Sequence, residues 1–116
     1  MSLKIFYIDD ELALLEVFKE LFDNEGIEIL TFVNPKKALE ELTKTQPDLI
    51  FIDYRLPGIT GDELAKSFNP ETPKALITGE MNVKTQTKFD RVFPKPFSIT
   101  ELEKYICEHK NKKLVA

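Results

Sequence analysis

The stretch Leu49-Ile50-Phe51-Ile52-Asp53 consists of four large apolar residues that end at an aspartate. A continuous apolar run of this kind is typical of a central parallel strand that is covered on both faces. Three other short runs also end at residues able to bind a phosphoryl group or a cation: Lys4–Ile8 before Asp9 and Asp10, Ala75–Ile77 before Thr78, and Arg91–Pro94 before Lys95. Because the carboxyl ends of neighbouring parallel strands meet in one crevice, we expect these residues to form a single site.

Strand-like and helix-like patterns alternate along the whole chain, with no long linker, low-complexity tract or internal repeat. Short apolar or alternating runs predict strands at Lys4–Ile8, Ile27–Phe32, Leu49–Ile52, Lys74–Thr78 and Arg91–Pro94. Apolar residues at helical spacing predict helices at Glu11–Asn24, from Asn34-Pro35 to Thr45, at Asp62–Phe68 and from Ser98 to His109. The remaining segment, Met81–Phe89, has few apolar anchors and is weakly helical at best.

The ends of three predicted helices carry recognisable signals. Gly26 follows the first helix and is expected to be its C-cap. Asn34 and Pro35 are typical of an N-cap and a first-turn position, and Ser98 with Glu101 forms a capping box. Successive βα units with right-handed crossovers predict an α/β fold, a flavodoxin-like doubly wound (βα)5 sandwich. Its parallel strand order would be 2-1-3-4-5, with a shortened or irregular fourth helix.

Length and composition limit the class of protein. At 116 residues we expect one domain covering 1–116, and the net charge of −4 argues against direct binding of nucleic acid, which needs a basic face. No apolar run approaches the roughly 18 residues of a membrane span, and the start, Met1 to Lys4, has no apolar signal region. We therefore expect a cytoplasmic protein with no membrane partner. The single cysteine, Cys107, excludes an internal disulfide and is expected to be a buried or half-buried helix residue.

The three aspartates indicate a cation site. Asp9 and Asp10 alone are equally compatible with a solvated turn, but Asp53 is predicted to lie beside them, and three carboxylates repel one another unless a cation neutralises them. Hard oxygen ligands without a nearby histidine or cysteine point to Mg²⁺. Thr78 can be read as a turn residue and Lys95 as a simple counter-ion. Together they are suited to bind phosphate oxygens opposite the metal.

At this point the chain resembles the receiver domain of two-component response regulators, the CheY-like family, over nearly all of its length. The matching motifs are Ile8-Asp9-Asp10-Glu11, Asp53-Tyr54-Arg55-Leu56-Pro57-Gly58 followed by Gly61, Ile77-Thr78-Gly79, and Lys95-Pro96-Phe97. The resemblance implies that the chain is a signalling phosphoacceptor and not an enzyme, except that it catalyses its own phosphorylation and dephosphorylation. The implied donor is a phosphohistidine on a sensor histidine kinase or a phosphotransfer protein.

The resemblance also implies a role for each site residue. Asp53 would be the phosphoacceptor, and Asp10 with Asp53 would ligate Mg²⁺ directly together with the backbone carbonyl of Arg55. Asp9 would act through a metal-bound water. Thr78 would donate a hydrogen bond to the phosphoryl group, and Lys95 would pair with it, next to a cis Lys95–Pro96 bond. His109, near the end of the last predicted helix, is expected to be a surface residue or a favourable helix-end charge and not a phosphorylated histidine.

Two departures from the family concern the output of the signal. Relatives carry Tyr or Phe three residues before the lysine, where this chain has Val92, and Phe93 is no substitute because adjacent strand residues point to opposite faces. The segment between Thr78 and Lys95 is also shorter than usual by about four residues, more than one helical turn. We therefore expect no aromatic switch. A mobile segment at Met81–Phe89 that becomes ordered on phosphorylation is the predicted replacement.

Other classes of protein share parts of this pattern. A haloacid-dehalogenase-type phosphatase needs a second acid where this chain has Arg55, and a flavodoxin-type carrier needs a phosphate loop where this chain has Asp9-Asp10-Glu11. A phosphorylation-independent interaction module that keeps the receiver fold is the stronger alternative. Arg55 and Glu80 are predicted to pair across the mouth of the site. Such a pair would either impede the water that hydrolyses the phosphate or be an ordinary surface pair that solvent screens. The sequence is compatible with a stand-alone regulator or a piece of a longer protein.

Overall fold

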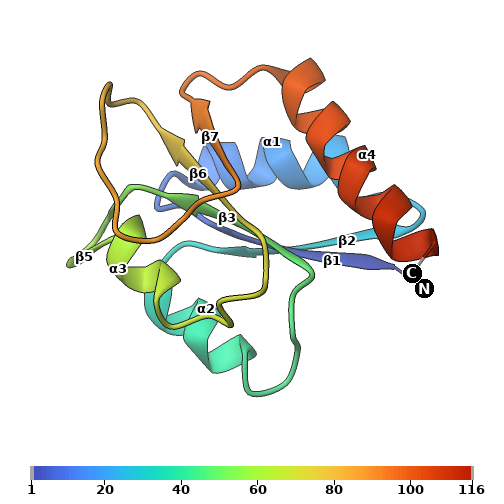
Figure 1. The fold of residues 1–116 in the computed structure, drawn as a ribbon, viewed down its shortest axis with the longest axis horizontal. Coiled ribbons are helices and arrows are strands. Elements are labelled where there is room, and N and C mark those ends of the chain that lie inside the picture. The colour runs from blue at the N-terminus through green and yellow to red at the C-terminus, as the bar shows by residue number, and fades with distance from the viewer. Residues whose placement is uncertain (1, 116) are drawn as a thin grey trace.

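The computed structural model describes residues 2–115, and its centre is a parallel five-stranded sheet (Figure 1). The sheet has the order β2-β1-β3-β6-β7, in which sequence-adjacent strands are joined by crossovers. Its strands are β1 (Leu3–Ile8), β2 (Ile27–Phe32), β3 (Leu49–Asp53), β6 (Lys74–Thr78) and β7 (Arg91–Pro94). Counting only the strands of this sheet, the order is the predicted 2-1-3-4-5. The predicted flavodoxin-like fold is therefore confirmed.

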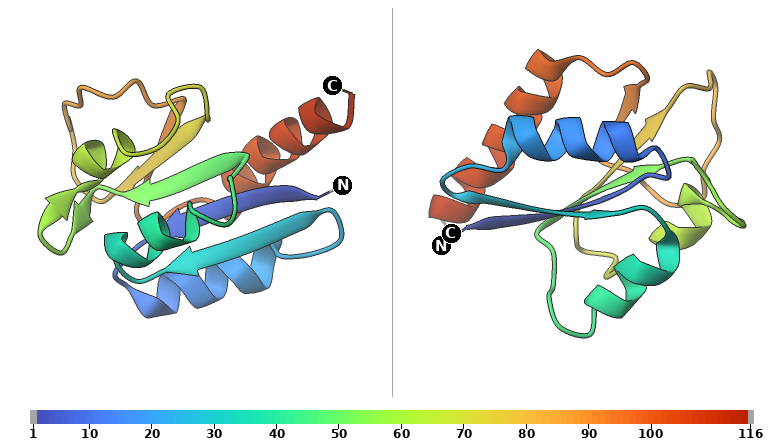
Figure 2. Two further views of the ribbon diagram at one scale, coloured as in Figure 1. Left: turned by 90° about the horizontal axis from the view of Figure 1, so that it is seen from below. Right: turned by 180° about the vertical axis from the view of Figure 1, so that it is seen from behind.

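Helices cover both faces of the sheet (Figures 1 and 2). On one face lie α1 (Leu12–Phe22) and α4 (Ile99–Val115), and on the other lie α2 (Pro35–Glu41) and α3 (Gly61–Ala65). Alternate residues of the strands supply two cores: Tyr7 and Phe51 pack under α1 and α4, whereas Phe6 and Ile52 pack toward α2 and α3. Such double coverage explains why β3 is apolar at every position before its final aspartate.

Of the helix-capping predictions, the Asn34 N-cap is confirmed, the capping box at Ser98 shows only the half in which Ser98 accepts, and the Gly26 C-cap is wrong. The Lys37 N–H donates to the Asn34 side chain at 3.0 Å, and the Glu101 N–H donates to Ser98 Oγ at 3.3 Å. Gly26 is not the C-cap of α1, because the helix ends at Phe22 and Asp23 takes the cap position. Gly26 instead has a φ of 87°, a left-handed conformation that suits glycine, in the turn that leads into β2.

Helix lengths differ from the predicted ones for local and tertiary reasons. Beyond Ala65 in α3 the backbone bonds tighten to the i to i+3 pattern, and beyond Glu41 in α2 they mix the i to i+3 and i to i+4 patterns. Both helices therefore end earlier than predicted. The last helix instead continues past His109 to Val115. There Lys113 Nζ lies 2.7 Å from both Asp48 Oδ2 and the Ser2 carbonyl oxygen, which ties the last turns to the amino end of β1.

The sequence predicted the segments that follow β3 and β6 only in outline. The expected loop after Asp53 contains a short antiparallel hairpin, β4 (Arg55–Leu56) with β5 (Ile59–Thr60). Residues 79–90, which replace the fourth helix, contain no helix at all. They lie against α3 (Figure 2). There the Asp62 carboxylate accepts the N–H groups of Gln86 and Thr87, both at 2.8 Å.

The missing helix leaves part of the sheet open. Val92 of β7 is 56% exposed, whereas its neighbour Phe93 is 2% exposed in the core under α1 and α4. The prediction that these two side chains point to opposite faces is therefore confirmed. The expectation that Cys107 is buried or half-buried is wrong, because Cys107 is exposed on α4. His109 has neither the expected surface position nor a helix-end position, because it packs on Tyr105 beside Asp90 and lies within α4, with a side chain only 13% exposed.

Within residues 2–115, no helix has the length and apolar character that crossing a membrane requires.

Candidate functional site

The carboxyl ends of β1, β3, β6 and β7 form one pocket, as the sequence predicted. The parallel register places Ile8 beside Ile52, Asp53 beside Ile77 and Thr78 beside Pro94, so the residues that follow these strands converge. The pocket has a volume of about 390 Å³, and its lining residues are Asp10, Glu11, Asp53, Arg55, Thr78, Gly79, Glu80 and Lys95. Asp9 lies beneath it, fully buried.

The three aspartates form a compact cluster at this edge of the sheet. Asp9, Asp10 and Asp53 each offer a carboxylate oxygen, and these three oxygens lie within 4.8 Å of one another. Burial, reinforced by the negative charge of Asp9, raises the pKa of Asp53 from 3.8 to about 6, although Lys95 partly opposes the increase. An all-carboxylate donor set with more negative charge than Lys95 alone can neutralise fits Mg²⁺.

Lys95 is the cation that holds the cluster together within the described chain. Its Nζ lies 3.1 Å from Asp9 Oδ2, 3.0 Å from Glu11 Oε1 and 3.2 Å from Asp53 Oδ1. Burial opposes the charge of Lys95, but the bonds to Glu11 and Asp9 outweigh it and raise the pKa of the ammonium group above its usual range. The Lys95–Pro96 bond is cis, as the family resemblance implied. The ammonium group is thus poised directly beside the Asp53 carboxylate.

Thr78 and the pair formed by Arg55 and Glu80 complete the mouth of the pocket. Thr78 is 5% exposed, and its Oγ1 accepts the Glu80 N–H at 3.0 Å, which leaves its hydroxyl proton available for another acceptor. Arg55 donates to Glu80 through Nε at 2.6 Å and through Nη2 at 2.9 Å. This pairing was predicted from sequence. Both side chains are largely exposed, so solvent screens their interaction.

Two residues of the site were missed by the sequence reasoning. Glu11 belongs to the motif Ile8-Asp9-Asp10-Glu11, but no role was predicted for it, because its contact with Lys95 joins residues that are 84 positions apart in the sequence. Tyr7 is fully buried, and its hydroxyl donates to Asp9 Oδ2 at 2.7 Å. Burial, together with the charge of Asp9, raises the pKa of Tyr7 above its usual range. The sequence did contain a signal for this contact, because side chains two residues apart in an extended chain, such as Tyr7 and Asp9, point to the same face.

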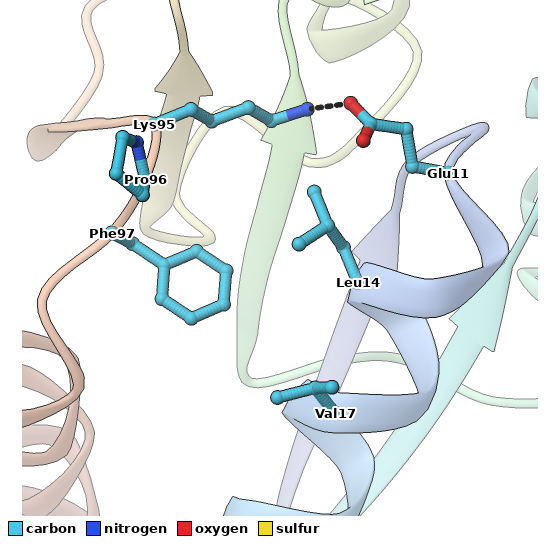
Figure 3. A pocket seen from close by; sticks show the side chains of 6 residues that line it. All are labelled: Glu11, Leu14, Val17, Lys95, Pro96 and Phe97. Atoms are coloured by element: carbon cyan, nitrogen blue, oxygen red, sulfur yellow. Dashed lines mark hydrogen bonds and ion pairs between the residues drawn. The ribbon is translucent and has the colours of Figure 1, made fainter.

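An apolar groove adjoins the pocket (Figure 3). It has a volume of about 460 Å³ and is lined by Leu14 and Val17 of α1 and by Pro96 and Phe97 of the loop after β7. The ion pair between Lys95 and Glu11 lies at its edge, where Figure 3 shows the lysine side chain extending toward the glutamate. Val17 is 44% exposed. The site therefore has an apolar surface directly beside its ionic centre.

The sequence profile of the response regulator receiver domain matches residues 5–107, and the chain belongs to this family. Sporulation initiation phosphotransferase F of Bacillus subtilis is 31% identical over 110 residues, which cover 88% of this chain and 89% of that protein. The phosphate regulon transcriptional regulatory protein PhoB of Rhizobium meliloti is 34% identical over 109 residues, but these span 85% of this chain and only 48% of that protein. The chain thus spans about half the length of that regulator.

A solved structure gives the same fold. The CheY-like response regulator receiver domain protein of Methanospirillum hungatei JF-1 superposes with a TM-score of 0.86 over 97% of this chain and 96% of that one, at 23% identity. The shared fold agrees with the family match over residues 5–107, which makes the chain a signalling receiver domain of the response regulator family. A haloacid-dehalogenase-type phosphatase would need a second acid two residues after Asp53. That position is occupied here by Arg55, which pairs with Glu80.

Proposed function

We propose that Asp53 accepts a phosphoryl group in a Mg²⁺-dependent reaction and that residues 1–116 act as a single receiver domain. The observation that carries this proposal is the contact of Lys95 Nζ with Asp53 Oδ1 at 3.2 Å, inside a cluster of three aspartates. A buried carboxylate at the mouth of a pocket is a competent nucleophile toward phosphorus when nearby cations neutralise the charge of the incoming group.

Each residue of the pocket has a defined part in this proposal. Asp10, Asp53 and the Arg55 backbone carbonyl would hold Mg²⁺ directly, and Asp9 would hold it through a water molecule. The bound ion would neutralise charge on the phosphoryl oxygens. The Asp53 carboxylate oxygen forms the new bond to phosphorus while the bond from phosphorus to the donor nitrogen breaks. Lys95 then exchanges a carboxylate partner for a phosphoryl oxygen, and the Thr78 hydroxyl donates to another.

The donor would be a phosphohistidine of a sensor histidine kinase or a phosphotransfer protein. The name of the Bacillus relative, a phosphotransferase of sporulation initiation, supports a place in such a relay. The apolar groove of Leu14, Val17 and Phe97 offers a surface on which a protein donor can rest with its histidine at Lys95. The only reactions catalysed would be gain and loss of the domain's own phosphate, and a cytoplasmic location is part of the proposal.

Acetyl phosphate tests the proposal without the cognate kinase. Wild-type protein with Mg²⁺ should incorporate one phosphoryl group, detected as a mass increase, and a metal chelator should abolish the incorporation. Asp53→Asn should not be labelled, whereas Asp62→Asn, which also removes one carboxylate but lies on α3, should be labelled normally. Stoichiometric labelling of Asp53→Asn at another carboxylate would refute the assignment.

A second function is favoured by a specific observation. Val92 is 56% exposed where relatives carry an aromatic switch residue, and residues 79–90 have no helix to transmit a change. These features suit a receiver fold that binds its target without phosphorylation. Failure of wild-type protein to accept phosphate from acetyl phosphate with Mg²⁺ would favour this alternative.

A further inference from the structure

A tyrosine in the core reaches the acidic cluster from below. Tyr7 lies in β1, which is paired with β2 and β3, and the residue is 0% exposed. Its ring packs on Phe18 with the ring centroids 4.6 Å apart and on Phe51 with the centroids 6.4 Å apart. Aromatic packing alone would be equally well served by phenylalanine, so the hydroxyl group needs a separate explanation.

The hydroxyl has one partner, the Asp9 carboxylate. Tyr7 and Asp9 are two residues apart and lie on the same face of the chain, and the tyrosine donates to Asp9 Oδ2 at 2.7 Å. Asp9 is itself 0% exposed, so it relies on protein donors instead of bulk water. The bond therefore joins two fully buried groups at the floor of the site.

The partners of Asp9 account for both of its oxygens. Oδ1 accepts the Glu11 N–H at 2.9 Å, and Oδ2 accepts the Tyr7 hydroxyl while it lies 3.1 Å from Lys95 Nζ. The Glu11 N–H belongs to the backbone, and the Tyr7 ring is held in the core between Phe18 and Phe51. Lys95 is shared with Glu11 and Asp53 and, in the proposed reaction, turns to the phosphoryl group. Of the two donors to Oδ2, only Tyr7 keeps its place throughout.

We infer that Tyr7 is a positioning residue for the Mg²⁺ site, holding the Asp9 carboxylate in one orientation through its hydroxyl group. This inference rests on the proposed function. Partners that orient a metal-binding carboxylate typically change metal affinity by about 10–100-fold when they are removed. Because Asp9 would act through a water molecule and keeps its Glu11 bond, the effect of losing Tyr7 is expected at the lower end, about tenfold.

Tyr7→Phe isolates the hydroxyl group because it keeps the ring and its packing. The variant should bind Mg²⁺ about tenfold more weakly than wild type in isothermal titration calorimetry. Tyr105→Phe is the matched control: Tyr105 is 2% exposed in the same core, and its hydroxyl also donates to an aspartate, Asp90 Oδ2, at 2.7 Å. This second bond lies away from the pocket. Urea unfolding without metal gives the structural cost of each change separately.

The outcomes separate the inference from the function on which it rests. Weaker Mg²⁺ binding by Tyr7→Phe, with unchanged binding by Tyr105→Phe, supports a positioning role that loss of stability alone does not produce. Equal or tighter binding by Tyr7→Phe, with normal binding by wild type, overturns the inference and leaves the proposed function intact. Equal weakening in both variants also overturns it, since the effect would then be a general consequence of a lost core hydroxyl. Absence of Mg²⁺ binding by wild type overturns the proposed function together with the inference.

Discussion

Replacing Asp53 by asparagine is expected to stabilise the metal-free protein at neutral pH. The Asp53 side chain is buried beside Asp9, which raises its pKa from 3.8 to about 6 despite the contact with Lys95. The native state therefore binds this proton more tightly than the unfolded chain does. As a result, the contribution of Asp53 to the free energy of unfolding decreases as the pH rises from 3.8 to about 6.

The size of the effect follows from the same pKa. A pKa that rises from 3.8 to about 6 corresponds to about 3 kcal/mol of unfavourable ionisation. Asparagine has nearly the same shape and no charge, so Asp53→Asn should recover about 1–3 kcal/mol above pH 6. The lower values apply if Asp9 and Lys95 rearrange around the ionised group in the wild type. Near pH 4 the two proteins should differ little, because Asp53 is then largely protonated in the native state.

Urea unfolding followed by circular dichroism, in a metal chelator and at a series of pH values, measures this difference. Asp62→Asn serves as a control for which the change in the free energy of unfolding should have the opposite sign. Burial raises the pKa of Asp62, but the N–H donors of Gln86 and Thr87 outweigh burial and lower it. That variant should lose stability at neutral pH. A less stable Asp53→Asn protein at neutral pH would refute the reasoning, as would a gain that does not change with pH. Saturating Mg²⁺ should narrow the difference by stabilising wild type, by about 2.7 kcal/mol at a hundredfold excess over its Kd.

Three further predictions concern the rim of the site. Replacing Arg55 and Glu80 together by alanine should speed loss of the phosphate several-fold while changing the free energy of unfolding by less than about 1 kcal/mol; unchanged phosphate loss would exclude a gating role. In hydrogen exchange, residues 79–90 should gain protection when the phosphate mimic beryllofluoride is added, and Asp62→Ala should lower their protection in the absence of beryllofluoride. If the segment is already fully protected without beryllofluoride, phosphorylation cannot act by ordering it. Gly61→Ala should cost about 1–3 kcal/mol in urea unfolding, because the added Cβ would collide with the backbone carbonyl oxygen of Asp53; unaltered stability would show that the end of β3 moves aside at little cost.

The sequence by itself determined the architecture and most of the site. Apolar runs covered on both faces mark parallel strands, and a polar residue directly after such a run lies at the carboxyl edge of the sheet. For this reason the sequence alone predicts that Asp9, Asp53, Thr78 and Lys95 lie together. The strands Ile27–Phe32, Lys74–Thr78 and Arg91–Pro94 have the predicted bounds, because their limits depend on local patterns of apolar and turn-forming residues.

Tertiary structure decided the features that depend on distant contacts. The contact of Lys95 with Glu11 joins positions 84 residues apart, and the length of α4 depends on the approach of Lys113 to Asp48. The conformation of residues 79–90 is set by Asp62 on α3, since the segment has too few apolar residues to form a packed helix of its own. Such contacts arise from the register of the sheet and the packing of helices on it, which no local pattern in the chain encodes.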